Sequence, residues 1–186
     1  MLQNDIRPAV YYCNPNITPY EEYSLRKEEC SRFARSLGLD VIDADYDHAA
    51  WLCAVKGLEN EPERGGRCLE CFKYRLLDSA RYALRNGYGL LTTTLASSRW
   101  KSLEQINRAG AWAVETALAD AGFHPAGRPV LSAETGLPPV VEASAPLLWW
   151  ERNWRKGGLQ ERRSALIKEY QFYNQTWCGC EFSRER

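Results

Sequence analysis

Short apolar runs alternate with longer stretches of helical periodicity in the part of the chain up to Asp120. Ala9 to Cys13 is a β-branched and aromatic run that stops at Asn14-Pro15-Asn16, which predicts a buried strand followed by a turn. Val41-Ile42 and Tyr88 to Thr93 predict two further strands. Strands alternating with helices at this spacing favour an α/β layer fold with a mostly parallel sheet.

The first predicted helix has the clearest boundaries. Thr18, Pro19 and Glu21 have the arrangement of a capping box, with Thr as N-cap, Pro at the first helical position and Glu at the third. The helix should run to about Leu37 and end at Gly38, a residue suited to the left-handed C′ position. Its start and its end are therefore both predicted from local residue chemistry.

Three more helices and one irregular segment complete this pattern. Helices are predicted from Asp47 to near Gly57, from the end of a breaker-rich loop over 58–66 to Gly87, and from the polar segment over 97–101 to Asp120. Residues 123–147 contain five prolines and little periodicity, which predicts an irregular insertion.

The C-terminal part, residues 148–186, should contain a basic helix from Leu159 to Tyr170 and a cysteine-bearing tail that packs on the site. No internal repeat interrupts the chain, and 186 residues suffice for one compact α/β domain. We therefore predict a single domain over residues 1–186.

The charge balance, the length of the apolar runs and the number of cysteines limit the classes of function that this chain could have. The chain has 24 Lys and Arg and 24 Asp and Glu, so binding to RNA would require a local basic patch rather than net charge. No apolar run is long enough for a membrane span and the N-terminus has no signal-peptide pattern, so we expect a cytoplasmic protein without a membrane partner. In that reducing compartment, seven cysteines favour metal binding or redox chemistry over structural disulfides.

Two cysteine pairs are the strongest chemical signal. Cys68 and Cys71 form a CxxC at the start of a predicted helix, where both sulfurs can face one ion and the helix N-terminus favours thiolates. Cys178 and Cys180 flank a glycine near the C-terminus and can complete a metal site or form a strained, easily reduced disulfide. The alternative for both pairs is that the cysteines serve only as small buried apolar residues.

Four thiolates permit either tetrahedral zinc or an iron–sulfur cluster, and spacing alone favours zinc. The other three cysteines lie in predicted secondary structure, where packing in the core is the expected role. These are Cys13, Cys30 and Cys53.

A second constellation is basic and aromatic. Arg99, Trp100 and Lys101 follow a predicted strand end, where open α/β sheets place ligands, and Trp154, Arg155 and Lys156 precede two glycines. Arginine can grip phosphates and aromatic rings can stack on unpaired bases, so we expect these six residues to bind substrate. Arg162 and Arg163 fit phosphate binding and a solvated helix face equally well. His48 and His124 are expected on the surface without a catalytic role.

Nine separate segments, in order, resemble the QueH-type epoxyqueuosine reductases, and together they cover nearly the whole chain outside 123–147. They are 12–17, 19–23 together with 26–29, 43–47, 56–65, 67–72, 92–95, 98–101, 153–156 and 173–180. The resemblance implies a Rossmann-like (HUP-type) three-layer sandwich. It also implies reduction of epoxyqueuosine to queuosine in the wobble position of tRNA.

The same resemblance implies a cofactor and roles for the cysteines. The family uses a 4Fe–4S cluster with further iron at the site, and an electron donor that the sequence does not identify. Cys68 and Cys71 would be cluster ligands. Cys178 and Cys180 would lie in the active site, and we favour a redox-active pair over metal ligands.

One departure from the family concerns its N-terminal motif, a strand running into a vicinal Cys-Cys and a third cysteine soon after. This motif is absent from the sequence, so two cluster ligands and the first strand would be missing. Three explanations stay open: a native start upstream of Met1, an inactive paralogue, or a rearranged metal site. A non-catalytic zinc- and RNA-binding module is the alternative function.

Overall fold

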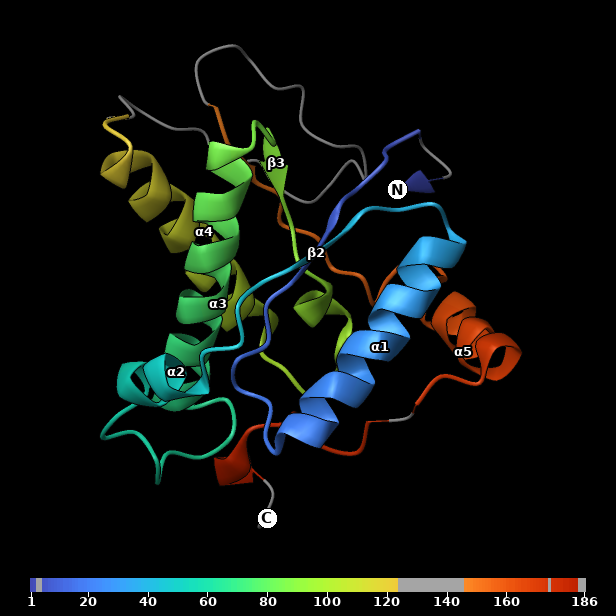
Figure 1. Ribbon diagram of the computed structural model, residues 1–186, viewed down its shortest axis with the longest axis horizontal. Helices are drawn as coiled ribbons and strands as arrows, with labels where there is room; N and C mark the ends of the chain where they lie inside the picture. The colour runs from blue at the N-terminus through green and yellow to red at the C-terminus, as the bar shows by residue number, and fades with distance from the viewer. Residues whose placement is uncertain (3–4, 124–145, 174, 184–186) are drawn as a thin grey trace. The chain divides into compact units, whose positions relative to one another are not determined.

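The computed structural model describes residues 1–2, 5–123, 146–173 and 175–183, and within them the chain divides into two compact units. One unit comprises residues 1–60 and 166–186, and the other comprises residues 61–165 (Figure 1). The expected mixed α/β class with parallel strands is confirmed in both units. The predicted insertion falls largely on residues 124–145, which lie outside the described residues.

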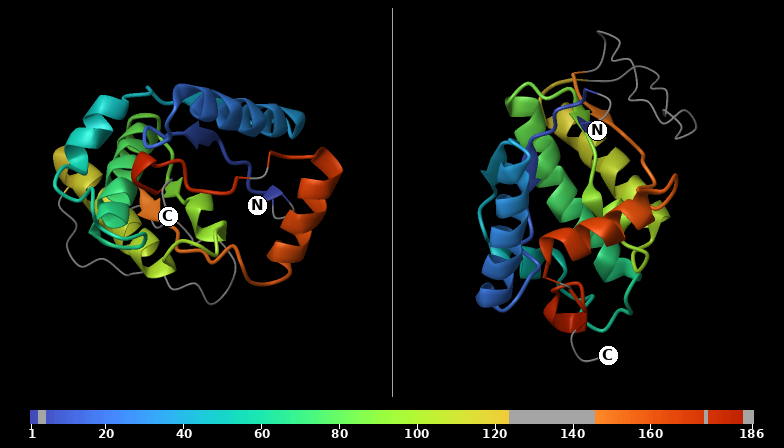
Figure 2. Two further views of the ribbon diagram at one scale, coloured as in Figure 1. Left: turned by 90° about the horizontal axis from the view of Figure 1, so that it is seen from below. Right: turned by 90° about the vertical axis from the view of Figure 1, so that its right-hand side faces the viewer.

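The first unit is built on a pair of parallel strands, β1 (Val10–Tyr12) and β2 (Val41–Asp43). Val10 pairs with Val41 and Tyr12 with Asp43 in the register. The helix α1 (Tyr20–Ser36) runs alongside this pair in both views of Figure 2. Buried aromatic and aliphatic side chains between them form a small core of Tyr12, Ile17 and Tyr23.

The ends of α1 confirm one prediction and correct another. Gly38 has φ +66°, and the amide of Leu39 donates to the carbonyl of Ala34 at 3.0 Å, which closes the helix as a Schellman motif. At the other end the predicted Thr18 cap is wrong. Pro19 is the N-cap, because its carbonyl accepts the first hydrogen bonds from the amides of the helix. No side chain caps this end.

A short helix, α2 (His48–Ala54), follows β2 and begins as predicted. The carboxylate of Asp47 accepts a hydrogen bond from the amide of Ala50 at 2.8 Å, which satisfies one of the amides that every helix start leaves without a partner. The helix ends three residues before Gly57, whose φ of +83° turns the chain into the loop that leads to the second unit.

The second unit is held together by two long helices, α3 (Gly66–Arg85) and α4 (Leu103–Asp120). The two lie side by side in Figures 1 and 2 and bury a shared apolar face. The side chains of that face recur at helical spacing: Phe72, Leu76, Ala80, Ala83, Ile106, Ala109, Ala113, Val114 and Ala117. Burying each of the larger ones stabilises the fold by about 1.5–3 kcal/mol.

Two short parallel strands cover this helix pair, β3 (Leu90–Leu91) and β4 (Leu148–Trp149). The predicted strand over 88–93 is therefore shorter than expected, because Thr93 already caps the 3₁₀ helix η2 (Thr94–Ser97). Trp149 packs so closely on α4 that a Cβ on Gly110 would lie 2.2 Å from its ring. Only glycine fits at that position.

The helix α5 (Leu159–Tyr170) has the bounds that the sequence predicts, and the division between the two units falls within it. The 3₁₀ helix η3 (Glu181–Ser183) ends the described chain. Within the described ranges no helix is long and apolar enough to cross a bilayer.

Candidate functional site

Cys68 and Cys71 lie in the first two turns of α3, where the sequence predicts them. Side chains three residues apart on a helix are neighbours on one face, so the two sulfurs are presented together. Cys71 is buried and Cys68 is half-buried. Both side chains therefore lie near the N-terminal, positive end of the helix dipole.

The turn before α3 fixes where this helix begins. The carboxylate of Glu61 accepts a hydrogen bond from the amide of Gly66 at 3.0 Å. The main-chain carbonyl of Glu61 accepts one from the buried guanidinium of Arg67 at 2.6 Å. A Cβ on Gly65 would lie 2.5 Å from the Glu61 carboxylate. A compact turn, closed by glycine and by two polar contacts, therefore delivers the cysteines.

Arg64 connects the cysteine pair with the segment before α4. Its backbone adopts φ +66°, a conformation that side-chain-bearing residues rarely take, and its amide donates to Cys68 Sγ at 3.3 Å. Its guanidinium donates to the carbonyls of Trp100 at 2.8 Å and Arg99 at 3.3 Å. Its own carbonyl accepts from the side-chain Nε2 of Gln105 at 2.7 Å. One residue thus contacts the cysteine pair, the basic segment and α4.

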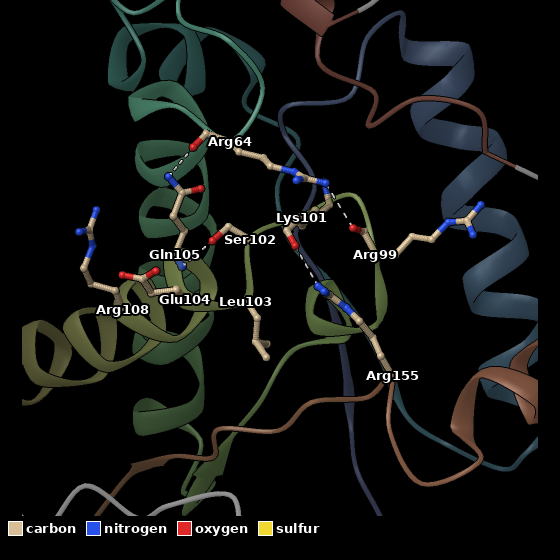
Figure 3. Close-up of a pocket in the computed structure, with 9 residues that line it drawn as sticks. All are labelled: Arg64, Arg99, Lys101, Ser102, Leu103, Glu104, Gln105, Arg108 and Arg155. Carbon is tan, nitrogen blue, oxygen red and sulfur yellow. Dashed lines mark hydrogen bonds between the residues drawn. The ribbon is translucent and has the colours of Figure 1, made fainter.

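A pocket of about 540 Å³ opens beside Arg64 (Figure 3). We call it the basic pocket. Its lining residues are Arg64, Arg99, Lys101, Ser102, Leu103, Glu104, Gln105, Arg108 and Arg155. Five of the nine are cationic and one is acidic, so the pocket carries a local positive charge in a chain with no net charge.

Of the side chains predicted to bind substrate, Trp100 and Lys156 are exposed and Lys101 lies beside an aromatic ring. Trp100 is 67% exposed, with the Arg99 guanidinium 4.9 Å from its ring centroid. The ammonium of Lys101 lies 5.7 Å from the centroid of the Phe72 ring. Lys156 is exposed. These positions leave the cationic groups accessible to a ligand.

Trp154 and Arg155 instead hold the backbone of the 93–101 segment. The indole of Trp154 donates to the carbonyl of Thr93 at 3.0 Å. The guanidinium of Arg155 donates to the carbonyls of Ala96 at 3.2 Å and Lys101 at 2.9 Å. These contacts give both residues a positioning role, and their predicted contact with substrate stays a prediction.

The second cysteine pair lies on the C-terminal tail, in the first unit. The sulfur of Cys178 lies 3.0 Å from Ser183 Oγ and accepts from the amide of Cys180 at 3.4 Å. Ser183 Oγ donates its proton to the carbonyl of Cys180 at 2.8 Å. Either atom of the Cys178–Ser183 contact can be the donor: the thiol donates while the Ser183 proton is on the Cys180 carbonyl, and the hydroxyl can turn to donate once Cys178 is a thiolate. All seven cysteines are within the described residues, and none forms a disulfide.

A buried arginine anchors this tail. Arg26, 5% exposed, donates to the carbonyls of Cys178 at 3.1 Å and Trp177 at 3.2 Å and to the Gln175 side chain at 3.3 Å. It is charge-paired with Glu22, one turn earlier on α1, at 2.6 Å. Buried charges are costly unless every hydrogen bond is made, and here the tail supplies the acceptors.

Gly179 is the second fixed point of the tail. Its φ is +98°, and a Cβ there would lie 2.7 Å from Cγ1 of Ile17. Its carbonyl accepts from the amide of Thr18 at 3.0 Å. The glycine between the two cysteines is therefore required by the backbone conformation and by close packing, as its position in the sequence suggested.

His48 corrects the expectation of a surface histidine. Its Nδ1 lies 2.7 Å from the carbonyl of Pro15, its Nε2 lies 3.4 Å from the Glu181 carboxylate, and its ring stacks on Tyr46 and Trp51. It thereby ties η3 at the tail to the turn after β1. His124 lies outside the described residues.

The remaining cysteines match the expected core role only in part. Cys13 is buried and Cys30 is half-buried, and burial raises the pKa of the Cys30 thiol. Cys53 is exposed, so its predicted place in the core is wrong. The helix α2 is too short to bury two faces, and it buries Trp51 instead.

Within the described part of the chain, no three Cys, His, Asp or Glu side chains are grouped so that they could hold a metal ion. The unit of residues 61–165 supplies two thiols, Cys68 and Cys71, which suit zinc or an iron–sulfur cluster in chemistry and provide half of a four-thiolate set.

Comparison with known proteins gives the family. The family described as epoxyqueuosine reductase QueH matches residues 1–124 and 138–186 of the chain. The chain belongs to the QueH family. The match covers both cysteine pairs, the basic pocket and Arg26.

Curated QueH relatives match over nearly the whole chain. Epoxyqueuosine reductase QueH of Histophilus somni is 40% identical over 175 residues, which cover 94% of this chain and 61% of that protein. The protein of the same name from Haemophilus influenzae is 38% identical, with 98% and 64% covered. That of Acinetobacter baylyi is 37% identical, with 98% and 72% covered. The chain thus spans less than two thirds of the length of the first two relatives.

Five residues of these sites were not foreseen from the sequence of this QueH family member. They are Arg26, Arg64, Gln105, Arg108 and Ser183. Gln105 alone carried a local signal, because Ser102 and Gln105 are spaced as a capping box, and the Ser102 hydroxyl accepts from the Gln105 amide at 3.3 Å. The others act through partners distant in sequence or through the backbone.

Proposed function

We propose that the chain is an epoxyqueuosine reductase that acts in the cytoplasm on epoxyqueuosine in the wobble position of tRNA and forms queuosine. The observation that carries the proposal is the match of the QueH family to nearly the whole chain. The curated relatives bear that name. The α/β units are consistent with parts of a Rossmann-like three-layer sandwich, the architecture that we propose for the whole protein.

The cofactor in this proposal is a 4Fe–4S cluster, with an additional iron, held in part by Cys68 and Cys71. Their support is chemical: two thiols on one helix face, at its positive end, with the Arg64 amide donating to Cys68 Sγ. Hydrogen bonds to cysteine sulfur tune the reduction potential of such clusters. When bound, the cluster would supply electrons and iron would polarise the epoxide oxygen.

Cys178 and Cys180 form a redox pair in this proposal. Removal of an epoxide oxygen as water consumes two electrons and two protons. Oxidation of two thiols to a disulfide releases two electrons and two protons, so the two reactions balance as epoxide plus dithiol giving alkene, disulfide and water. An electron donor, still unidentified, would then reduce the disulfide. The contacts of Cys178 with Ser183 and the Cys180 amide place donors around the sulfur that must lose its proton.

The cofactor proposal is tested by measuring iron, labile sulfide and zinc per chain after anaerobic reconstitution. We expect a cluster in the unmodified protein and its loss in Cys68→Ser and Cys71→Ser. Cys53→Ser is the matched control, because this thiol is exposed and lies outside both pairs. Stoichiometric zinc without sulfide would support the non-catalytic binding module instead.

A further inference from the structure

The basic pocket gathers five cations around one carboxylate. Within the described part of the chain, none of these five cations forms an ion pair, unlike Arg26, Lys27, Arg32, Lys73 and Arg81, which pair with carboxylates. Five cations and one carboxylate, Glu104, leave a formal excess of four positive charges. Such an excess favours an anionic ligand.

Two of the five cations frame the pocket, and three are available to a ligand. The guanidinium groups of Arg64 and Arg155 donate to main-chain carbonyls of residues 96–101. Among the described residues, the charged groups of Arg99, Lys101 and Arg108 make no hydrogen bond to protein. Their donors can therefore bind phosphate oxygens without breaking an internal hydrogen bond.

The size and spread of the pocket indicate more than one phosphate. About 540 Å³ is within the range of roughly 300–1,000 Å³ that small-molecule sites occupy, but the lining is charged rather than apolar. Figure 3 shows the side chains of Arg99 and Arg108 on opposite sides of Ser102 and Leu103. Cations arranged in this way suit successive phosphates of a chain better than one free ion.

Trp100 adds a stacking surface at the pocket edge. It is the most exposed large apolar side chain in the described residues, and it is flanked by Arg99 and Lys101. An exposed ring beside cations is the arrangement with which proteins bind single-stranded nucleic acid, since bases stack on the ring and phosphates on the cations. A paired duplex keeps its bases stacked inside and leaves such a ring without a partner.

We infer that the basic pocket binds the sugar-phosphate backbone of single-stranded RNA through Arg99, Lys101 and Arg108, with an unpaired base stacked on Trp100. Arg64 and Arg155 are positioning residues that hold the 96–101 segment in place. This inference rests on the proposed function and assigns its RNA contacts. The Arg64 amide also contacts Cys68 Sγ, which places the RNA site next to the cysteine pair within one unit.

The test measures binding of an anticodon stem-loop RNA that lacks epoxyqueuosine to the full chain without metal, at several KCl concentrations. We expect Lys101→Gln and Arg108→Gln each to weaken binding and to reduce the salt slope by about 0.7, the value for one phosphate contact of a single strand. Trp100→Ala should weaken binding by about five- to hundredfold with the slope unchanged. Glu104→Gln should tighten binding.

Arg85→Gln is the matched control, because Arg85 is an exposed cation of the same unit at the far end of α3. It should bind like the unmodified protein. Unchanged affinity and slope in both Lys101→Gln and Arg108→Gln would overturn the assignment. Equal competition by a fully paired RNA would overturn the single-stranded part, and displacement of RNA by inorganic phosphate at the same phosphate concentration would indicate a free-anion site. Since no epoxyqueuosine or metal is present, a failed reductase assay leaves these results unaffected.

Discussion

Cys68 and Cys71 are positioned by a 20-residue helix, whereas Cys178 and Cys180 lie on an irregular tail. The backbone of α3 and its preceding turn fix the first pair, mainly with contacts that span a few residues of sequence, and Arg64 links this turn to residues 99–105. The second pair depends on Arg26, about 150 residues earlier in the chain, and on a glycine that packs against Ile17. The first pair is thus held mainly by local contacts and the second mainly by long-range contacts, so different substitutions should disturb each.

The largest effect is expected for Arg26→Met, which removes the charge that anchors the tail. Carbonyls of Trp177 and Cys178 lose their donor, and Glu22 loses its partner. Breaking a buried pair in this way should lower the free energy of unfolding by about 3 kcal/mol, measured by urea denaturation. Cys178 should also react faster with a thiol reagent, while Cys68 should not change.

Arg32→Met is the control for this prediction. Arg32 is on the same helix and pairs with Glu29, but its side chain is 51% exposed. Exposed pairs contribute about 0–1 kcal/mol, so the control should unfold near the unmodified protein. Equal denaturation midpoints for Arg26→Met and the unmodified protein would show that the tail does not depend on this contact.

Gly179→Ala is expected to have the next largest effect. Alanine must adopt φ +98° and place its Cβ against Ile17, which together should cost about 2 kcal/mol of unfolding free energy. Gly158 has φ +74° and no atom within 4 Å of the added Cβ, so Gly158→Ala isolates the backbone term at about 1 kcal/mol. Calorimetry that finds the two variants equally stable would contradict the packing of the tail on Ile17.

Ser183→Ala should have a smaller and more chemical effect. It removes the hydroxyl beside Cys178 Sγ, a hydrogen bond of about 1 kcal/mol, and therefore a stabilising contact for the thiolate. Alkylation of Cys178 at a fixed pH should slow about fivefold, as followed by mass spectrometry. Ser183→Thr keeps the hydroxyl and should restore much of the rate, and a rate for Ser183→Ala equal to that of the unmodified protein would exclude the contact.

The smallest effect concerns two cysteines outside both pairs. Burial raises the pKa of Cys30, so its reactive thiolate forms only at higher pH, whereas Cys53 is exposed to reagents. Across a pH series, Cys30 should be alkylated more slowly than Cys53 in the folded protein. In urea its reaction should begin at lower pH, because unfolding removes the burial. Equal pH profiles of Cys30 in the folded and unfolded chain would contradict this assignment.

The fold elements were largely predictable where local chemistry sets them. Asp47 caps α2, Gly38 closes α1, and α5 begins and ends at the expected residues. The Thr18 cap failed because the Pro19 carbonyl, one residue later, takes the role. The strand β4 was not predicted, because its two residues are a strand only through their pairing with β3, which the local sequence does not show.

The candidate site was predictable in its cysteines and much less in what surrounds them. A CxxC after a glycine-rich loop can be recognised in the sequence alone. The left-handed backbone of Arg64 cannot, because the glycines that follow it are the residues expected to adopt that conformation in the turn. Arg26 and Arg108 resemble any helical surface cation in their local pattern. Only the tertiary structure distinguishes Arg26, which is buried and anchors the tail, from Arg108, which lines the basic pocket.

The most direct test of the central claim is turnover by the anaerobically reconstituted protein on tRNA that contains epoxyqueuosine, with a chemical reductant and queuosine measured in the digested tRNA. The proposed function predicts queuosine formation by the unmodified protein and by Cys53→Ser, and its loss in Cys68→Ser and Cys178→Ser. A cluster-containing protein that forms no queuosine would contradict it, as would undiminished turnover in both Cys68→Ser and Cys178→Ser.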